Sequence, residues 1–206
     1  IDHHLVSALV ERWRPETRTF HMTMGEVTIT LEDVHHLLGL PTDGGGVSDR
    51  HGRHNFCAII GDLLGVEPAA GRDLQRGLLG LHYLREQFDD YVIHAGTEFG
   101  RRRYTRALIL RILGSMLFVD TASSFLPIRY LLYLDDFQRT GTFSWGSAVH
   151  ATLYRELCKA TRAGRREMGG CALLLQLWAW TRFPTISPNL PTVEDQDVIE
   201  HEIYAH

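Results

Sequence analysis

The strongest constraint on the fold is the segment of residues 169–183, which predicts a helix that is apolar on nearly every side. Residues 172–180 contain no charged side chain, and Pro184 ends the segment. A helix of this kind must be covered by other elements over most of its surface. The chain therefore needs several further elements around it, and 206 residues are enough to build one such core.

Further amphipathic helices are predicted along the whole chain, because apolar residues recur at helical spacing. Asp2, Thr30 and Ser144 stand where N-caps are expected, and Asp33 completes a capping box with Thr30. Gly39 is placed to end the second helix. The predicted helices cover residues 2–14, 31–38, 56–64, 74–88, 103–118, 127–140 and 145–162.

Between the first two helices the spacing changes to that of strands. Residues 18–23 and 26–30 alternate in character around Gly25, which predicts a short hairpin. Residues 42–53 include three glycines, but no Gly-Lys-Ser/Thr follows, so a flexible connector is favoured over a phosphate-binding loop. The fold class is therefore mainly α: a compact multi-helix domain with a small N-terminal β-hairpin.

Composition favours a single helical domain over residues 1–186, followed by an acidic C-terminal tail over residues 187–206 with room for a short helix. The net charge of −4 argues against a polybasic nucleic-acid binder, and no apolar run reaches the roughly 18 residues of a membrane span. Three cysteines are too few for a disulfide scaffold, which indicates a reducing compartment such as the cytosol or nucleus.

The sequence contains only weak patterns for a metal-binding site or a catalytic nucleophile. His51, His54 and Cys57 recur at intervals of three, but a structural zinc site needs about four convergent ligands. Ser144 with His150, or a cysteine with a histidine, could form a nucleophilic pair only if the fold brings the two side chains within hydrogen-bond distance. No metal ligand, cofactor-binding residue or catalytic residue is predicted.

Two arginine clusters stand out from the rest of the charged residues. The first contains Arg101, Arg102, Arg103 and Arg106, and the second contains Arg162, Arg165 and Arg166. Such clusters are most often solvated helix faces, and contact with nucleic-acid phosphates is the alternative.

Two blocks of sequence carry a family signature. The first runs from Thr19 to Pro41 through the predicted hairpin and the capped helix. The second begins with Phe143-Ser144-Trp145-Gly146-Ser147, continues with Tyr154-Arg155-Glu156-Leu157-Cys158 and ends with Leu177-Trp178-Ala179-Trp180. In this order the blocks resemble the plant mobile domain, a transposon-associated module of the MAINTENANCE OF MERISTEMS-like family.

The resemblance implies a nuclear protein that acts in transposon silencing, gene-expression control and genome or meristem integrity. It also implies a protein partner that resembles the plant serine/threonine phosphatase seven. The family is sometimes labelled aminotransferase-like, but Lys159 is the only lysine and no context for pyridoxal phosphate surrounds it. After Ser187 the chain departs from the family pattern, because an acidic tail replaces further segments with tryptophan and tyrosine.

The function expected from these features is a non-catalytic protein-interaction module without a cofactor. The predicted interface residues are Arg155, Glu156, Arg162, Arg166 and Trp178. The alternative is a transposon-derived nucleic-acid-binding accessory domain that uses Arg101, Arg102, Arg103 and Arg106. Catalysis is the third and least favoured reading.

Overall fold

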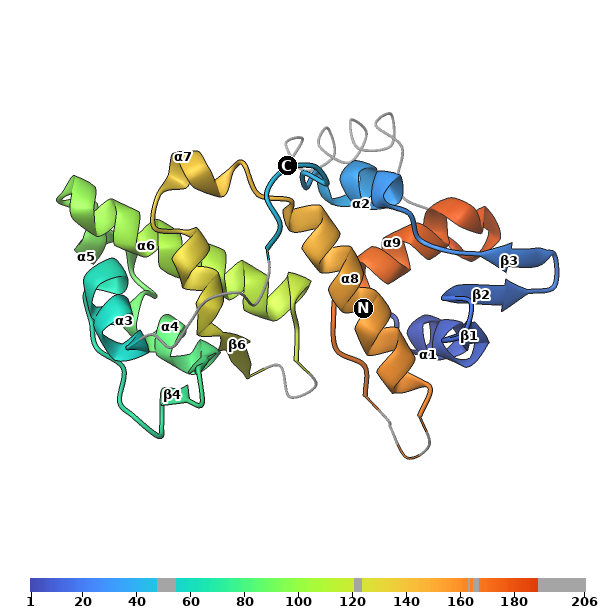
Figure 1. Ribbon diagram of the computed structural model, residues 1–206, viewed down its shortest axis with the longest axis horizontal. Coiled ribbons are helices and arrows are strands. Elements are labelled where there is room, and N and C mark those ends of the chain that lie inside the picture. Colours follow the sequence, from blue (N-terminus) through green and yellow to red (C-terminus); the bar gives the residue numbers. More distant parts are fainter. Residues whose placement is uncertain (48–54, 121–123, 163, 165–166, 189–206) are drawn as a thin grey trace, which may run out of the picture.

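The computed structural model describes residues 1–47, 55–120, 124–162, 164 and 167–188 (Figure 1). The helices are α1 (His3–Arg12), α2 (Leu31–Leu38), α3 (Phe56–Leu64), α4 (Leu81–Gln87), α5 (Tyr91–Ala95), α6 (Glu98–Ile112), α7 (Phe137–Thr140), α8 (Trp145–Ala160) and α9 (Ala172–Arg182). A π-helix, η1 (Leu113–Leu117), extends α6, and η2 (Ile128–Tyr133) and η3 (Pro184–Ile186) are 3-10 helices. The predicted mainly α class is confirmed.

The strands form two small antiparallel sheets. The first sheet has the order β1 (Trp13–Arg14), β2 (Thr19–Met22), β3 (Gly25–Val27), and the second has the order β4 (Leu74–Gln75), β5 (Leu78–Gly80), β6 (Phe125–Pro127).

The first and last parts of the chain fold together, and the middle part forms the other side of the molecule (Figure 1). Helix α2 contacts α8 and α9, and α1 contacts α9, whereas α6 contacts α3, α4 and α5. Val119 and Gly170 join the two sides through a backbone hydrogen bond of 2.7 Å. The predicted tail lies almost wholly outside the described residues, so the proposed domain limits stay a prediction.

The predicted hairpin is present, and β1 adds a third strand to it. Trp13 pairs with Phe20, and both rings are fully buried with 4.8 Å between their centroids. Pro15 disfavours helical backbone at the residue before it. The chain therefore leaves α1 after Arg12, two residues earlier than predicted, and continues as an extended strand beside β2.

The predicted caps of α1 and α2 are confirmed. Asp2 accepts hydrogen bonds from the first turn of α1, and Thr30 and Asp33 form a reciprocal capping box. Gly39 ends α2 with φ of 65°. Ser144 lies at the N-cap position of α8 as predicted, but its side chain makes no capping hydrogen bond, and its backbone N–H donates to the Gly45 carbonyl at 2.8 Å.

The helix predicted over residues 74–88 is wrong in its first half. Residues 74–80 form the β4–β5 hairpin, whose two-residue turn has φ of 51° at Arg76 and 81° at Gly77. Two positive φ angles match the twist of antiparallel strands, so this turn favours a hairpin. The helix predicted over residues 127–140 is also wrong, because Pro127 pairs with Leu78 in the sheet and only the short helices η2 and α7 follow.

Gly44 and Gly45 are held in place, so the prediction of a flexible connector is wrong for this part of residues 42–53. The Gly45 N–H donates to the Thr142 carbonyl at 2.9 Å. Gly44 has φ of 106°, and a Cβ atom there would lie 2.2 Å from the same carbonyl oxygen. Most of the remainder of that prediction falls on residues 48–53, which lie outside the described residues.

Helix α8 lies directly against the backbone that follows α2. The Gly146 N–H donates to the Pro41 carbonyl at 2.8 Å, and the Ser147 Oγ donates to the Thr42 carbonyl at 2.8 Å. A Cβ atom on Gly146 would lie 3.0 Å from the Pro41 oxygen and 3.2 Å from the Leu40 oxygen. The two motif blocks therefore meet at a close contact in which a side chain at position 146 would crowd the backbone.

We expect Gly146→Ala to lower the free energy of unfolding by about 2 kcal/mol, because the added methyl group crowds the backbone carbonyls of Leu40 and Pro41. Gly96→Ala is the control, since Gly96 has a helical φ of −63° and a Cβ atom there would have nothing within 4 Å. Urea denaturation followed by circular dichroism measures both variants. Equal stability of the two variants would contradict this reading of the contact.

Candidate interaction surface

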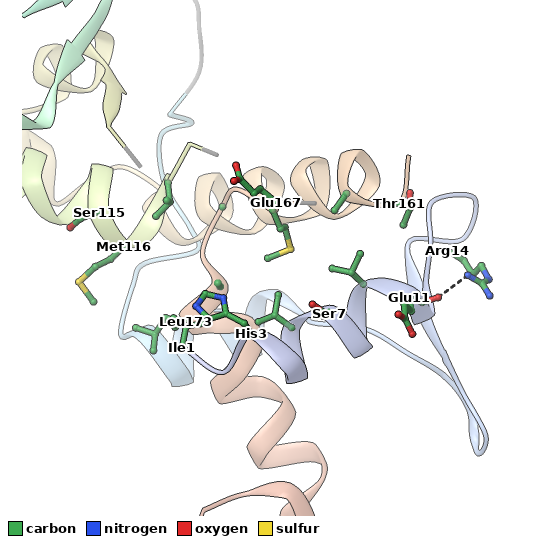
Figure 2. Close-up of a pocket in the computed structure, with 17 residues that line it drawn as sticks. Ile1, His3, Ser7, Glu11, Arg14, Ser115, Met116, Thr161, Glu167 and Leu173 are labelled. Carbon is green, nitrogen blue, oxygen red and sulfur yellow. Dashed lines mark hydrogen bonds between the residues drawn. The ribbon is translucent and has the colours of Figure 1, made fainter. Parts of the chain in front are cut away.

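A groove of about 1030 Å³ opens between α1 and the end of α8. Figure 2 shows His3, Ser7 and Glu11 along α1 on one side, and Thr161 and Glu167 on the other. The remaining lining residues come from α1, the region around η1, the end of α8 and the start of α9: Ile1, Val6, Val10, Arg14, Ser115, Met116, Val119, Ala160, Met168, Gly170, Ala172 and Leu173.

The local sequence explains why the groove is open. Helix α1 buries Val6 and Leu9 and leaves Ser7 and Glu11 exposed. Gly170, with φ of 84°, precedes α9 and lines the groove. The apolar floor between charged rims can take the side chains of a protein segment. The sequence analysis missed the α1 side, although its polar residues opposite the apolar stripe were a visible signal.

Three of the predicted interface residues lie on or just after the same part of α8. Glu156, whose side chain is 12% exposed, accepts a hydrogen bond of 2.7 Å from Lys159 Nζ and lies 3.5 Å from Arg155 Nε. Arg162 is exposed and follows Thr161, which lines the groove. Glu156 therefore pairs with two cations of α8 and is itself largely covered, and neither Glu156 nor these two cations are among the residues that line the groove.

Two other residues of the predicted interface do not join this surface. Trp178 is wrong as an interface residue, because it is fully buried, with ring centroids 5.1 Å from Phe20 and 6.0 Å from Phe183. Its position in a helix that is buried on most sides explains the burial. Arg166 lies outside the described residues.

The arginines of α6 differ in how exposed their side chains are. Arg101 and Arg102 are exposed, and Arg102 forms an ion pair of 2.8 Å with Glu98. Arg103 is half-buried and lies over the Phe99 ring at 4.3 Å. The cluster therefore presents fewer free cations to a phosphate backbone than the sequence alone indicates.

Arg106 is wrong as a nucleic-acid contact, because it is only 7% exposed and acts inside the fold. Its guanidinium donates to the carbonyls of Leu134 and Asp135, both at 2.8 Å, and of Leu63 at 3.2 Å. Burial lowers the pKa of this guanidinium from its usual value. Arg106 thus ties the end of α3 to the segment between η2 and α7.

The nucleophile candidates have structural roles in the described residues. Burial raises the pKa of the Cys171 thiol, and the Cys158 Sγ accepts a hydrogen bond of 3.3 Å from the Trp13 indole. His150 Nε2 lies 2.9 Å from the Ile29 carbonyl, so the imidazole is engaged there. Lys159 is occupied by its ion pair with Glu156.

Neither a metal centre nor a membrane span is found in the part of the chain that the structure describes. No three His, Cys, Asp or Glu side chains among these residues are grouped as ligands. His51 and His54 fall outside them. None of the described helices is long and apolar enough to cross a bilayer.

Asp33 links the two motif blocks electrostatically. Its carboxylate accepts a hydrogen bond of 2.7 Å from Arg182 of α9 and caps α2 through Thr30. Burial raises the pKa of Asp33, but the Thr30 hydrogen bonds and the Arg182 charge outweigh burial and hold the pKa below its usual value of 3.8. The ionised carboxylate therefore stabilises the fold at neutral pH.

Comparison with known proteins confirms the resemblance that the motif blocks predicted. The plant mobile domain family model matches residues 1–206. The chain is 41% identical over 189 residues to an Arabidopsis thaliana "Serine/threonine-protein phosphatase 7 long form homolog", which covers 92% of this chain and 14% of that protein.

Two further Arabidopsis thaliana relatives are similar at comparable levels. Protein MAIN-LIKE 2 is 40% identical over 191 residues, covering 92% of this chain and 28% of its own length. Protein MAINTENANCE OF MERISTEMS is 36% identical over 196 residues, covering 93% and 40% respectively. The chain thus spans less than half of each of these relatives. No solved structure matches it at a significant level.

We expect Arg106→Met to lower the free energy of unfolding by roughly 3 kcal/mol, because three carbonyls lose their donor inside the fold. Arg102→Met is the control: it removes an exposed ion pair within one helix and should change stability by less than about 0.5 kcal/mol. Thermal and urea denaturation measure the difference. A folded, stable Arg106→Met variant that has lost only nucleic-acid affinity would contradict the structural role.

Proposed function

Because this chain belongs to the plant mobile domain family, we propose that it is a non-catalytic protein-interaction domain that works in the nucleus. In this proposal it acts in complexes for transposon silencing, gene-expression control and genome or meristem integrity. The single observation that carries the proposal is the groove between α1 and the end of α8.

The groove fits a segment of another protein better than a small substrate. Its floor is built from Val6, Met168 and Leu173, and its rims carry Glu11 and Glu167. Apolar centres with charged rims are the usual anatomy of protein interfaces. Methionine side chains adapt to differently shaped apolar partners. The partner in this proposal inserts apolar side chains and is oriented by the surrounding charges.

The proposed partner is a phosphatase-like protein. The name of one relative, "Serine/threonine-protein phosphatase 7 long form homolog", supports an association between this type of domain and phosphatase-like chains. Arg155 and Arg162 are exposed cations on and just after α8, and they suit an acidic segment on that partner.

Nucleic-acid binding remains the second candidate because Arg101 and Arg102 are exposed on neighbouring positions of α6. This candidate is weaker than the first, since Glu98 already pairs with Arg102 and Arg106 is buried. Phosphate contacts through these arginines would produce an affinity that falls steeply with salt.

We expect the double variant Arg155→Glu, Arg162→Glu to weaken binding of the phosphatase-like partner about tenfold or more, because it reverses two exposed cations of the proposed interface. The matched control is Arg101→Glu, Arg102→Glu, which reverses two exposed arginines on α6 and should bind the partner normally. Quantitative copurification from plant nuclei measures both variants.

Three outcomes would contradict the proposal. The first is no stable protein partner for the unaltered chain, and the second is equal partner binding by both double variants. The third is salt-sensitive nucleic-acid binding that only the α6 variant loses, which would favour the second candidate.

A further inference from the structure

Helix α5 presents a strongly exposed apolar surface far from the groove. Val92 and Ile93 are each 77% exposed, and the neighbouring Tyr91 is 47% exposed. Helix α5 lies at one end of the molecule, beside the start of α6 (Figure 1). Adjacent large apolar side chains with this exposure mark surfaces that bind another protein.

The structure holds α5 firmly in this position. Asp90 caps it by accepting a hydrogen bond of 2.8 Å from the Val92 N–H. Its inner side packs on α6, since the rings of Tyr91 and Tyr104 are 5.1 Å apart. A Cβ atom on Gly100 would lie 2.3 Å from the His94 carbonyl, so the two helices approach as closely as glycine permits. The cap and the packing on α6 therefore keep Val92 and Ile93 exposed to solvent.

The apolar surface continues along α6. Leu108 and Ile112 are 41% and 43% exposed, and they follow Tyr104 at successive intervals of four residues. Residues at this spacing lie on one face of a helix. An occupant of the α5 surface can therefore extend its contact onto α6.

The charges around α5 are arranged with opposite signs at its two ends. Asp89 and Asp90 precede the helix and are exposed. At the other end, the Arg101 Nη1 donates to the Ala95 carbonyl at 2.9 Å, and Arg102 pairs with Glu98 at 2.8 Å. The patch is thus acidic at one end, apolar in the middle and net positive at the other end, where two arginines stand beside one glutamate.

We propose that the α5 surface docks a second copy of this chain around a two-fold axis. In a two-fold contact the same patch occurs on both copies in antiparallel orientation. The acidic end of each α5 then faces Arg101 and Arg102 of the other copy, while Val92 and Ile93 pack across the axis. In this antiparallel arrangement each acidic end meets the positive end of the other patch. The charges of the patch therefore favour a second copy of this chain as its occupant.

The expected association is weak because the patch is small. Interfaces at the low end of the size range belong to transient complexes. We expect a dissociation constant on the order of 10 to 100 μM. This dimer does not depend on the proposed groove partner, and the two surfaces can be occupied together because they lie on different parts of the fold.

Analytical ultracentrifugation of the purified 206-residue chain, from about 1 μM to about 1 mM, tests the proposal. Ile93→Glu should remain monomeric across this range and keep the unaltered helical content. Met24→Glu is the matched control, because Met24 is 76% exposed in the turn between β2 and β3, and it should dimerise normally. A chain that is monomeric throughout, or equal loss of dimer in both variants, would overturn the proposal.

Charge-reversal variants, tested alone and as a mixture, distinguish this two-fold dimer from nonspecific association through the apolar side chains. Asp89→Arg alone and the pair Arg101→Glu, Arg102→Glu alone should each dimerise at least about tenfold more weakly, because like charges then face each other twice. Mixing the two variants should restore a dimer, since each contact again joins opposite charges. Failure of the mixture to form a dimer would overturn the two-fold arrangement, and capture of only a different protein at this surface would identify another occupant.

Discussion

The rest of the structure depends on the close approach of α8 to the backbone that follows α2. At Gly146 the helix begins against the carbonyls of Leu40 and Pro41, and a Cβ atom at this position would lie only 3.0 Å and 3.2 Å from the Pro41 and Leu40 oxygens. The hydroxyl of Ser147 continues the contact at the Thr42 carbonyl, and the side chains of His150 and Tyr154 contact the Ile29 carbonyl, which lies just before α2. One side of α8 is therefore packed against the first part of the chain.

The packing of α8 on residues 29–42 determines where the groove lies. With α8 attached to residues 29–42, α9 returns under it, and α1 packs on α9 through Val6 and Leu9. The end of α8 then faces α1 across the groove, and Glu156 pairs with Arg155 and Lys159 on α8. The residues that identify the family are therefore mostly those that hold the fold, while the surface available to a partner is formed by neighbouring positions.

Sequence reasoning succeeded where the signal was local. The Thr30–Asp33 capping box and the glycine stop after α2 involve residues only a few positions apart, and both were predictable. The β4–β5 hairpin was missed because its apolar residues also fit helical spacing and its turn is Arg76-Gly77, not a familiar Asn-Gly pair. Arg106 was misassigned because its partners are carbonyls 28 to 43 residues away, which no local pattern reveals. Likewise, the predicted interface combined exposed arginines with Trp178, which is buried. A sequence motif alone does not show whether a tryptophan lies in the core or on the surface.

The central claim is that binding occurs at the groove between α1 and α8, apart from the arginines of α6. Hydrogen exchange on the chain alone and with its copurified protein partner tests this claim most directly, because protection reports where backbone opening is suppressed. The account predicts slower exchange in α1, at residues 155–162 and at residues 167–173, with α6 unchanged. Slower exchange confined to α6, with the groove segments unaffected, would contradict it.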